Sequence, residues 1–146
     1  MYYMPTRLFF GDGALEQAKD HLIRLGINAL IVTGKSSACL SGALEEVQRL
    51  LLDADIGWKI FDRVSENPTV DTVMDGVTEL VLAHCDFVIG IGGGSPIDAA
   101  KAIALVAANR VDRDDIYDVS RYTKSLPLVA IPTTSGTGTE VTQYSV

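Results

Sequence analysis

The sequence predicts a single α/β domain over residues 1–146, in which helices cover both faces of a mostly parallel β-sheet. Strand-like and helix-like segments alternate along the chain, which is typical of parallel strands joined by helical crossovers. Several of the strand-like segments are continuous apolar runs, and such runs indicate strands that are buried on both faces. With 146 residues, 47% of them hydrophobic, the chain can form one sizeable core.

The first half of the chain begins with a short strand at residues 7–10, which Gly11 and Gly13 interrupt. Apolar residues then recur at helical spacing from Leu15 to Leu25, and Gly26 is expected to end this helix. The next elements are a buried strand at 29–33, a turn at 34–37, a helix with an apolar stripe from Leu44 to Ala54, and a strand at 56–61.

In the second half, a loop at 65–68 leads to Thr69, a natural N-cap for a helix with an apolar stripe from Val70 to Val81. Residues 87–91 form the most strand-like segment of the chain. The remaining elements are a helix at 99–108 that is apolar on nearly every side, a polar surface segment at 112–117, and a buried strand at 126–131.

Composition excludes several classes of protein. The chain has 19 acidic and 12 basic residues, a formal net charge of −7, which argues against a nucleic-acid-binding surface. It does not open with a basic region and an apolar run, and no apolar run reaches the roughly 18 residues of a membrane span, so we expect a soluble cytoplasmic protein. Cys39 and Cys85 lack metal-site spacing and are expected to be buried, reduced thiols. His21 and His84, both expected on helices, are too isolated to indicate a metal site.

The strongest local signal is a glycine-rich turn at residues 92–98, Gly-Gly-Gly-Ser-Pro-Ile-Asp, directly after the strand at 87–91. Ser95 suits an N-cap, Pro96 the first helical position, and Asp98 the third residue after the cap. A helix start exposes N–H groups and the positive end of the helix dipole, and glycines let a diphosphate approach the backbone. A plain tight turn into a capped helix is the alternative, but three consecutive glycines after a buried strand favour phosphate binding.

This turn matches neither common phosphate motif, because it lacks the third glycine of G-x-G-x-x-G and the Gly-Lys-Ser/Thr of a P-loop. A second loop, at 133–140, is rich in hydroxyls and glycines, which suits a phosphate, a ribose or a carboxamide. Taken alone, it would be interpreted as an ordinary solvated turn. Ser95 and Ser135 are poor nucleophile candidates, since neither lies in G-x-S-x-G and no histidine is placed as a base.

Together, these motifs resemble the iron-containing alcohol dehydrogenases, most closely the propanediol- and butanol-type enzymes. The family hallmarks G-G-G-S-x-x-D and P-T-T-x-G-T-G-[ST]-E-V-T correspond to residues 92–98 and 132–142. Residues 10–14, 32–36 and 66–68 match as well, so the resemblance covers essentially the whole chain.

The resemblance implies a Rossmann-like domain that binds NAD or NADP, followed in the family by an all-helical domain that holds Fe²⁺ or Zn²⁺ through one Asp and three His. Neither histidine of this chain matches a ligand position. We therefore expect the cofactor-binding part of an enzyme that transfers hydride between a small alcohol or aldehyde and NAD(P). The chain alone is expected to lack the metal site and the activity, and to self-associate as a homo-oligomer.

The resemblance also assigns roles. Residues 93–98 would hold the diphosphate and the nicotinamide side, with Asp98 accepting a hydrogen bond from the carboxamide or the ribose, although its role could be limited to capping. Residues 133–137 would contact the phosphates and ribose, and Asn67 the adenosine end. The cofactor-binding residues expected are Gly34, Lys35, Ser36, Asn67, Gly93, Gly94, Ser95, Pro96, Ile97, Asp98, Thr133, Thr134, Ser135, Gly136 and Thr137.

The preference between NAD and NADP depends on the turn at residues 34–37, where NAD-selective sites usually place an acid against the ribose 2′-hydroxyl. Here the turn has a glycine, a lysine and two serines, which leaves room and donors for a 2′-phosphate and favours NADP. Two other functions stay open at this stage. One is a stand-alone nucleotide-binding module without catalysis, and the other is an enzyme related to glycerol dehydrogenase or dehydroquinate synthase.

Overall fold

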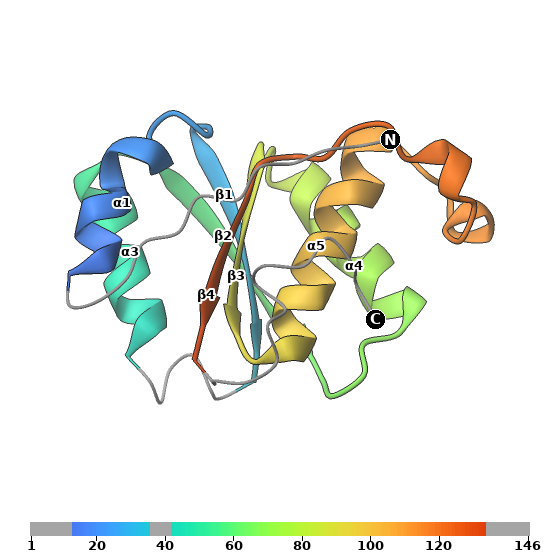
Figure 1. Cartoon of the computed structure of the whole chain (residues 1–146), viewed down its shortest axis with the longest axis horizontal. Helices are drawn as coiled ribbons and strands as arrows, with labels where there is room; N and C mark the ends of the chain where they lie inside the picture. Colours follow the sequence, from blue (N-terminus) through green and yellow to red (C-terminus); the bar gives the residue numbers. More distant parts are fainter. Residues whose placement is uncertain (1–12, 36–41, 134–146) are drawn as a thin grey trace.

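The computed structural model describes residues 13–35 and 42–133, which form a three-layer α/β arrangement (Figure 1). Two helices pack on one face of a central sheet and two on the other, so the predicted fold class is confirmed. The first pair is α1 (Ala14–Leu22) and α3 (Ala43–Asp53), and the second is α4 (Val70–Leu82) and α5 (Gly94–Asn109). The strand expected at 7–10 lies outside the described residues.

The sheet is parallel throughout, with the strand order β2-β1-β3-β4. Its strands are β1 (Asn28–Gly34), β2 (Gly57–Val64), β3 (Phe87–Gly92) and β4 (Leu128–Pro132). The central strands β1 and β3 are almost entirely buried, because helices cover both of their faces. This explains why their sequences are continuous apolar runs instead of alternating ones.

Each face of the sheet has its own apolar core. Phe61, Val88 and Ile103 lie in the core beneath α4 and α5. Leu51 and Ile89 lie in the core beneath α1 and α3. The two cores fix the helices against the sheet, and with them the loops that follow the carboxyl ends of the strands.

Gly26 has a different role from the one predicted. Helix α1 ends at Leu22, and the backbone then turns back toward β1 without using Gly26 as its cap. The Asp86 carboxylate accepts hydrogen bonds from the N–H groups of Ile27 and Asn28, at 3.0–3.1 Å. A Cβ on Gly26 would lie 2.2 Å from Asp86 Oδ1, so this glycine makes room for the carboxylate.

Three further predictions need correction. Strand β2 continues to Val64 because an extra residue bulges out opposite the end of β1. Strand β4 is only partly buried, not fully, because it stands at the end of the described sheet. His84 follows α4 with a φ of 55° and is not helical. The N-cap at Thr69 is confirmed, since its hydroxyl accepts the Thr72 N–H at 3.2 Å.

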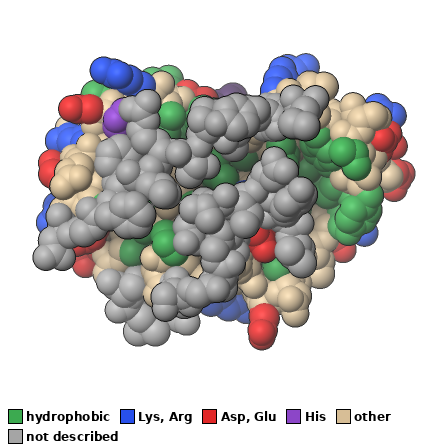
Figure 2. Space-filling model, viewed as in Figure 1, with side chains coloured by type: hydrophobic (Ala, Val, Ile, Leu, Met, Phe, Trp, Pro, Cys, Tyr) green, Lys and Arg blue, Asp and Glu red, His purple; other side chains and the backbone are tan. Residues whose placement is uncertain are grey.

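The connection from α5 to β4 is long and contains two short 3₁₀ turns, at Arg113–Asp115 and Val119–Arg121. Asn109 holds the two ends of this connection together. Its side-chain amide donates to the Lys124 carbonyl at 2.7 Å and accepts from the Thr123 N–H at 3.1 Å. Tyr117 is 84% exposed in this connection. The connection lies at the right of Figure 1, and Figure 2 shows hydrophobic side chains at the surface on that side. Among the described residues, no helix is both long and apolar enough to cross a bilayer.

Candidate functional site: the carboxyl edge of the sheet

The candidate site lies at two neighbouring strand ends from which the chain crosses to opposite faces of the sheet. Strands β1 and β3 are hydrogen-bonded neighbours, with Thr33 beside Ile91 at their carboxyl ends. The chain leaves β1 for α3 on one face of the sheet and leaves β3 for α5 on the other. In open α/β sheets, a crevice forms between two such strand ends, and ligands bind there.

The glycine turn follows the end of β3 at this edge of the sheet. Strand β3 ends at Gly92, whose φ of 140° is accessible to few residues other than glycine. Gly93 is the N-cap of α5, and its carbonyl accepts the Ile97 N–H at 3.4 Å. A glycine has no side chain with which to cap the helix. Because the first N–H groups of a helix have no intrahelical partner, this helix start could receive an anion.

The predicted capping arrangement is wrong. Helix α5 begins at Gly94, one residue before the expected cap, so Ser95 and Pro96 lie within its first turn. Asp98 is therefore too far along the helix to complete a capping box. Pro96 is still tolerated, since the first-turn N–H groups have no intrahelical partner. Asp98 is partly buried and takes part in an interaction, and its role toward a ligand stays a prediction.

Gly90 contributes to the site in a way that the sequence analysis did not identify. A Cβ on this residue would lie 2.8 Å from Ala100 Cβ and 3.4 Å from Ile97 Cα, both on α5. The missing side chain thus lets α5 pack directly against β3. In dinucleotide sites the third glycine of the motif allows this close packing of helix and strand. Here a glycine two residues before the turn has that role, and the spacing Gly90-x-Gly92 was the available signal.

Thr133 lies beside the glycine turn. Its N–H donates to the Gly92 carbonyl at 2.8 Å, which extends the pairing between β3 and β4 by one residue. Its hydroxyl oxygen is buried and has no hydrogen-bond partner within the described part of the chain. A buried hydroxyl of this kind is costly unless something binds it. The other predicted residues of this loop, Thr134, Ser135, Gly136 and Thr137, lie outside the described residues.

The end of β1 lies next to the end of β3 at this edge of the sheet. Gly34 is the last residue of β1 and pairs with Val64 beyond the bulge in β2. Lys35 follows and is exposed, while Ser36 lies outside the described residues. Asn67 stands further away, after β2, exposed and with a φ of 54°. Since β1 separates β2 from β3, Asn67 and the glycine turn lie toward opposite ends of this edge.

Two of the residues expected to bind the cofactor lie in the core. Ile97 and Pro96 are buried in the interior, so only their backbone could face a ligand.

Cys85 lies at the opposite edge of the sheet, where burial and the neighbouring Asp86 raise the pKa of its thiol to about 11. This confirms the expectation of a buried thiol, and Cys39 lies outside the described residues.

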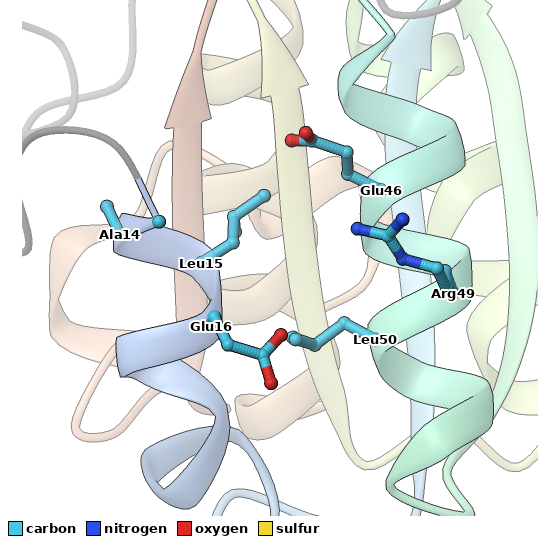
Figure 3. Close-up of a pocket in the computed structure, with 7 residues that line it drawn as sticks. Ala14, Leu15, Glu16, Glu46, Arg49 and Leu50 are labelled. Carbon is cyan, nitrogen blue, oxygen red and sulfur yellow. The ribbon is translucent and has the colours of Figure 1, made fainter.

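Two cavities lie away from the glycine turn. One, of about 320 Å³, lies between the beginnings of α1 and α3, and Figure 3 shows Glu16, Glu46 and Arg49 around it. The other, of about 620 Å³, lies between the ends of α4 and α5, beside His84 and Arg110. In residues 13–35 and 42–133, no three His, Cys, Asp or Glu side chains come together as a metal site would require.

Comparisons with known proteins agree with this arrangement. The family profile of the iron-containing alcohol dehydrogenases matches residues 5–146. Alcohol dehydrogenase 4 of Saccharomyces cerevisiae is 39% identical over 147 residues, which cover 99% of this chain and 38% of that protein. A crystal structure of an iron-containing alcohol dehydrogenase from Thermotoga maritima superimposes with a TM-score of 0.87 at 45% identity, over 96% of this chain and 39% of that one.

Two other relatives differ from each other in the cofactor that their names state. The NADPH-dependent butanol dehydrogenase of Clostridium saccharobutylicum is 37% identical over 149 residues, covering 99% of this chain and 38% of that protein. The NAD-dependent methanol dehydrogenase of Bacillus methanolicus is 34% identical over 146 residues, with the same coverage. The chain thus spans about 38% of the length of the curated relatives it matches.

Proposed function

The chain belongs to the iron-containing alcohol dehydrogenase family, and on this basis we propose that it binds a nicotinamide dinucleotide with the diphosphate at the turn between β3 and α5. The observation that carries the proposal is the glycine N-cap of α5, at the point where the crossovers change direction, beside the unsatisfied hydroxyl of Thr133. A diphosphate supplies acceptors for free amide N–H groups and for a hydroxyl, so it fits both features.

The proposed contacts follow the order of the strand ends. The N–H groups of Gly94 and Ser95 hold the diphosphate, and Thr133 donates to one of its oxygens. Asp98 accepts from the nicotinamide carboxamide or its ribose, and Asn67 lines the adenosine end. When bound, the nicotinamide ring accepts or releases the hydride, and the chain's residues bind and orient the cofactor.

We favour NADP over NAD because Gly34 and Lys35 leave space and a positive charge where the 2′-phosphate would lie. Both dependences occur among the relatives, so the family alone does not decide. The variant Gly34→Asp should weaken NADP⁺ binding at least tenfold and spare NAD⁺, because a carboxylate repels the 2′-phosphate but accepts from a 2′-hydroxyl. Tighter binding of NAD⁺ than NADP⁺ by the parent chain would refute the preference.

For the whole protein we propose hydride transfer between a small alcohol or aldehyde and this cofactor. The names of the relatives support this reaction class, but the chain spans only 38% of their length. The residues that the structure describes do not fit an iron or zinc site, since they bring no suitable ligands together. We therefore assign no metal-dependent step to them. The homo-oligomer and the single-domain organisation stay predictions of the sequence.

Isothermal titration calorimetry of the chain with NADP⁺ and NAD⁺ tests the proposal directly. We expect saturable one-to-one binding, and Asp98→Ala should weaken it without lowering the unfolding temperature appreciably. Asp20→Ala, an exposed acid on α1, is the matched control and should bind like the parent. Absence of binding in a folded sample would refute the proposed function, whereas unchanged affinity in Asp98→Ala would remove only Asp98 from the site.

A further inference from the structure

Thr33, near the carboxyl end of β1, is one of two polar residues in the buried set of the described chain, with an exposed fraction of 2%. Side chains alternate between the faces of a strand, so Thr33 shares its face with Ile31. It is paired with Ile91 of β3, and both isoleucines belong to the apolar core beneath α1 and α3. A valine has the same shape and would bury no polar atom there, so the hydroxyl needs an explanation.

The Thr33 hydroxyl donates to the Gly34 carbonyl at 2.9 Å. Along a strand, successive carbonyl groups point to the neighbouring strands on opposite sides. The Asn28 carbonyl points to the β3 side, because it accepts the Asp86 N–H at 2.9 Å. Gly34 follows Asn28 by an even number of residues, so its carbonyl points to the β3 side as well. Thr33 thus occupies an acceptor that is directed at the end of β3.

An N–H group points back from the end of β3. The Gly92 carbonyl accepts the Thr133 N–H at 2.8 Å, on the β4 side of β3. In a planar trans peptide the C=O and N–H groups point in opposite directions, so the Gly93 N–H is directed at β1. Within residues 13–35 and 42–133, no hydrogen bond is described for this N–H.

The two strands therefore stop pairing one step before they need to. The pairing of β1 with β3 ends at Thr33 and Ile91, and the next bond in the series would join the Gly93 N–H to the Gly34 carbonyl. The carbonyl instead has the Thr33 hydroxyl as its donor. The Gly93 N–H lies next to the buried Thr133 hydroxyl, which also lacks a partner in the described chain. Two neighbouring unpaired donors suit the anionic oxygens of a diphosphate.

We propose that Thr33 is a positioning residue of the cofactor site, whose hydroxyl occupies the Gly34 carbonyl, ends the pairing of β1 with β3 and so leaves the Gly93 N–H to the dinucleotide diphosphate. The inference rests on the proposed dinucleotide binding, and Thr33 acts without touching the ligand. Without the hydroxyl, the Gly34 carbonyl takes the Gly93 N–H, and the ligand must break that bond before it can bind. One hydrogen bond to an anionic oxygen corresponds to about tenfold in affinity.

The test compares Thr33→Val with Thr33→Ser in the full chain. Valine keeps the shape of threonine and removes the donor, whereas serine keeps the donor. Calorimetry gives the Kd for NADP⁺, and NMR gives the hydrogen-exchange rate of the Gly93 amide in the unliganded chain. We expect Thr33→Val to raise the Kd about tenfold and to slow the exchange of the Gly93 amide severalfold, because that N–H gains a partner. Thr33→Ser should return both values toward those of the parent. If valine prevents folding, Thr33→Ala removes the same donor and carries the same expectations.

Thr78→Val is the matched control, because it also removes a hydroxyl that donates to a backbone carbonyl, that of Met74 at 3.0 Å, on the exposed side of α4. It should leave the Kd and the exchange of the Gly93 amide at the parent values. Equal affinities of Thr33→Val and the parent would overturn the inference while dinucleotide binding stands. Weaker binding without slower exchange of the Gly93 amide would also overturn it and indicate a structural role. If the folded parent binds neither NADP⁺ nor NAD⁺, the proposed function fails and this inference fails with it.

Discussion

Replacing Gly90 by alanine tests whether the position of α5 on β3 sets the affinity of the glycine turn. The added Cβ would lie 2.8 Å from Ala100 Cβ and 3.4 Å from Ile97 Cα. Carbon atoms pack at about 3.5–4.0 Å, so α5 must move away from β3 by roughly 1 Å. Neither obstructing atom can move by a side-chain rotation, because one is a Cβ and the other is backbone.

Two energies follow from this displacement. Overpacking of a core costs about 1–3 kcal/mol, and the loss of glycine freedom in the unfolded chain offsets about 0.4–1 kcal/mol of that. The net destabilisation of roughly 1–2 kcal/mol should lower the unfolding temperature by a few degrees. A shift of about 1 Å at the helix start misaligns the N–H groups with the diphosphate, so we expect the Kd for NADP⁺ to rise at least tenfold.

Gly76→Ala provides the control, because its Cβ would also collide with α5 but at another place. The nearest atom is Ile103 Cδ1 at 2.3 Å, the end of a side chain that can rotate away. Gly76 belongs to α4, so its packing bears on stability and not on the contact between α5 and β3. Thermal unfolding and calorimetric titration of both variants separate the two effects. If Gly90→Ala binds NADP⁺ as tightly as the parent, or if Gly76→Ala loses as much affinity as Gly90→Ala, binding does not depend on the position of α5 against β3 and the reasoning is wrong.

Three more predictions follow from single residues. Thr133→Val should stabilise the unliganded chain by about 1 kcal/mol, since it removes an unsatisfied buried hydroxyl, and should weaken NADP⁺ binding; lower stability together with unchanged binding would contradict this. Asn109→Ala should destabilise by about 1 kcal/mol in urea unfolding, because its hydrogen bonds to the exposed connection at 110–127 are lost, and an unchanged midpoint would refute the role. In a Cys39→Ser background, Cys85 should react with a thiol reagent at pH 8 only when the chain unfolds, since burial raises its pKa to about 11. Because the pKa of this thiol in the folded chain exceeds its ordinary value of 9.0, the thiol contributes stability below pH 9 that is lost as the pH rises toward 11, and a stability that is flat over this range would contradict the shift.

Elements that local patterns determine could be predicted from the sequence. The apolar run of β3, the stripe of α4 and the N-cap at Thr69 each depend on neighbouring residues, and each is confirmed. The order of the strands depends on contacts between distant segments. The sequence predicts a parallel sheet, but only the structure places β1 between β2 and β3 and so locates the point where the crossovers change direction.

Two glycines show why tertiary contacts could not be predicted. Gly26 was expected to end a helix, and Gly90 received no role beyond the strand. In both cases the absent Cβ leaves room for a residue far along the chain, Asp86 for the first and Ala100 for the second. A local pattern reports where glycine permits an unusual backbone angle, but not where it permits a close approach.

The failed prediction of a cap at Ser95 has its own physical meaning. Helix α4 starts with a side-chain cap, Thr69, whereas the N-cap residues of α1, α3 and α5 are glycines, which carry no side chain: Gly13, Gly42 and Gly93. A cap at the start of α5 would occupy an N–H group that a diphosphate needs, and would place a side chain where the ligand must approach. Stability of the free helix and affinity for an anion therefore compete for the same donors. The sequence rules for helix starts describe the first of these requirements, and the anion site that we propose at the start of α5 would depart from them because it satisfies the second.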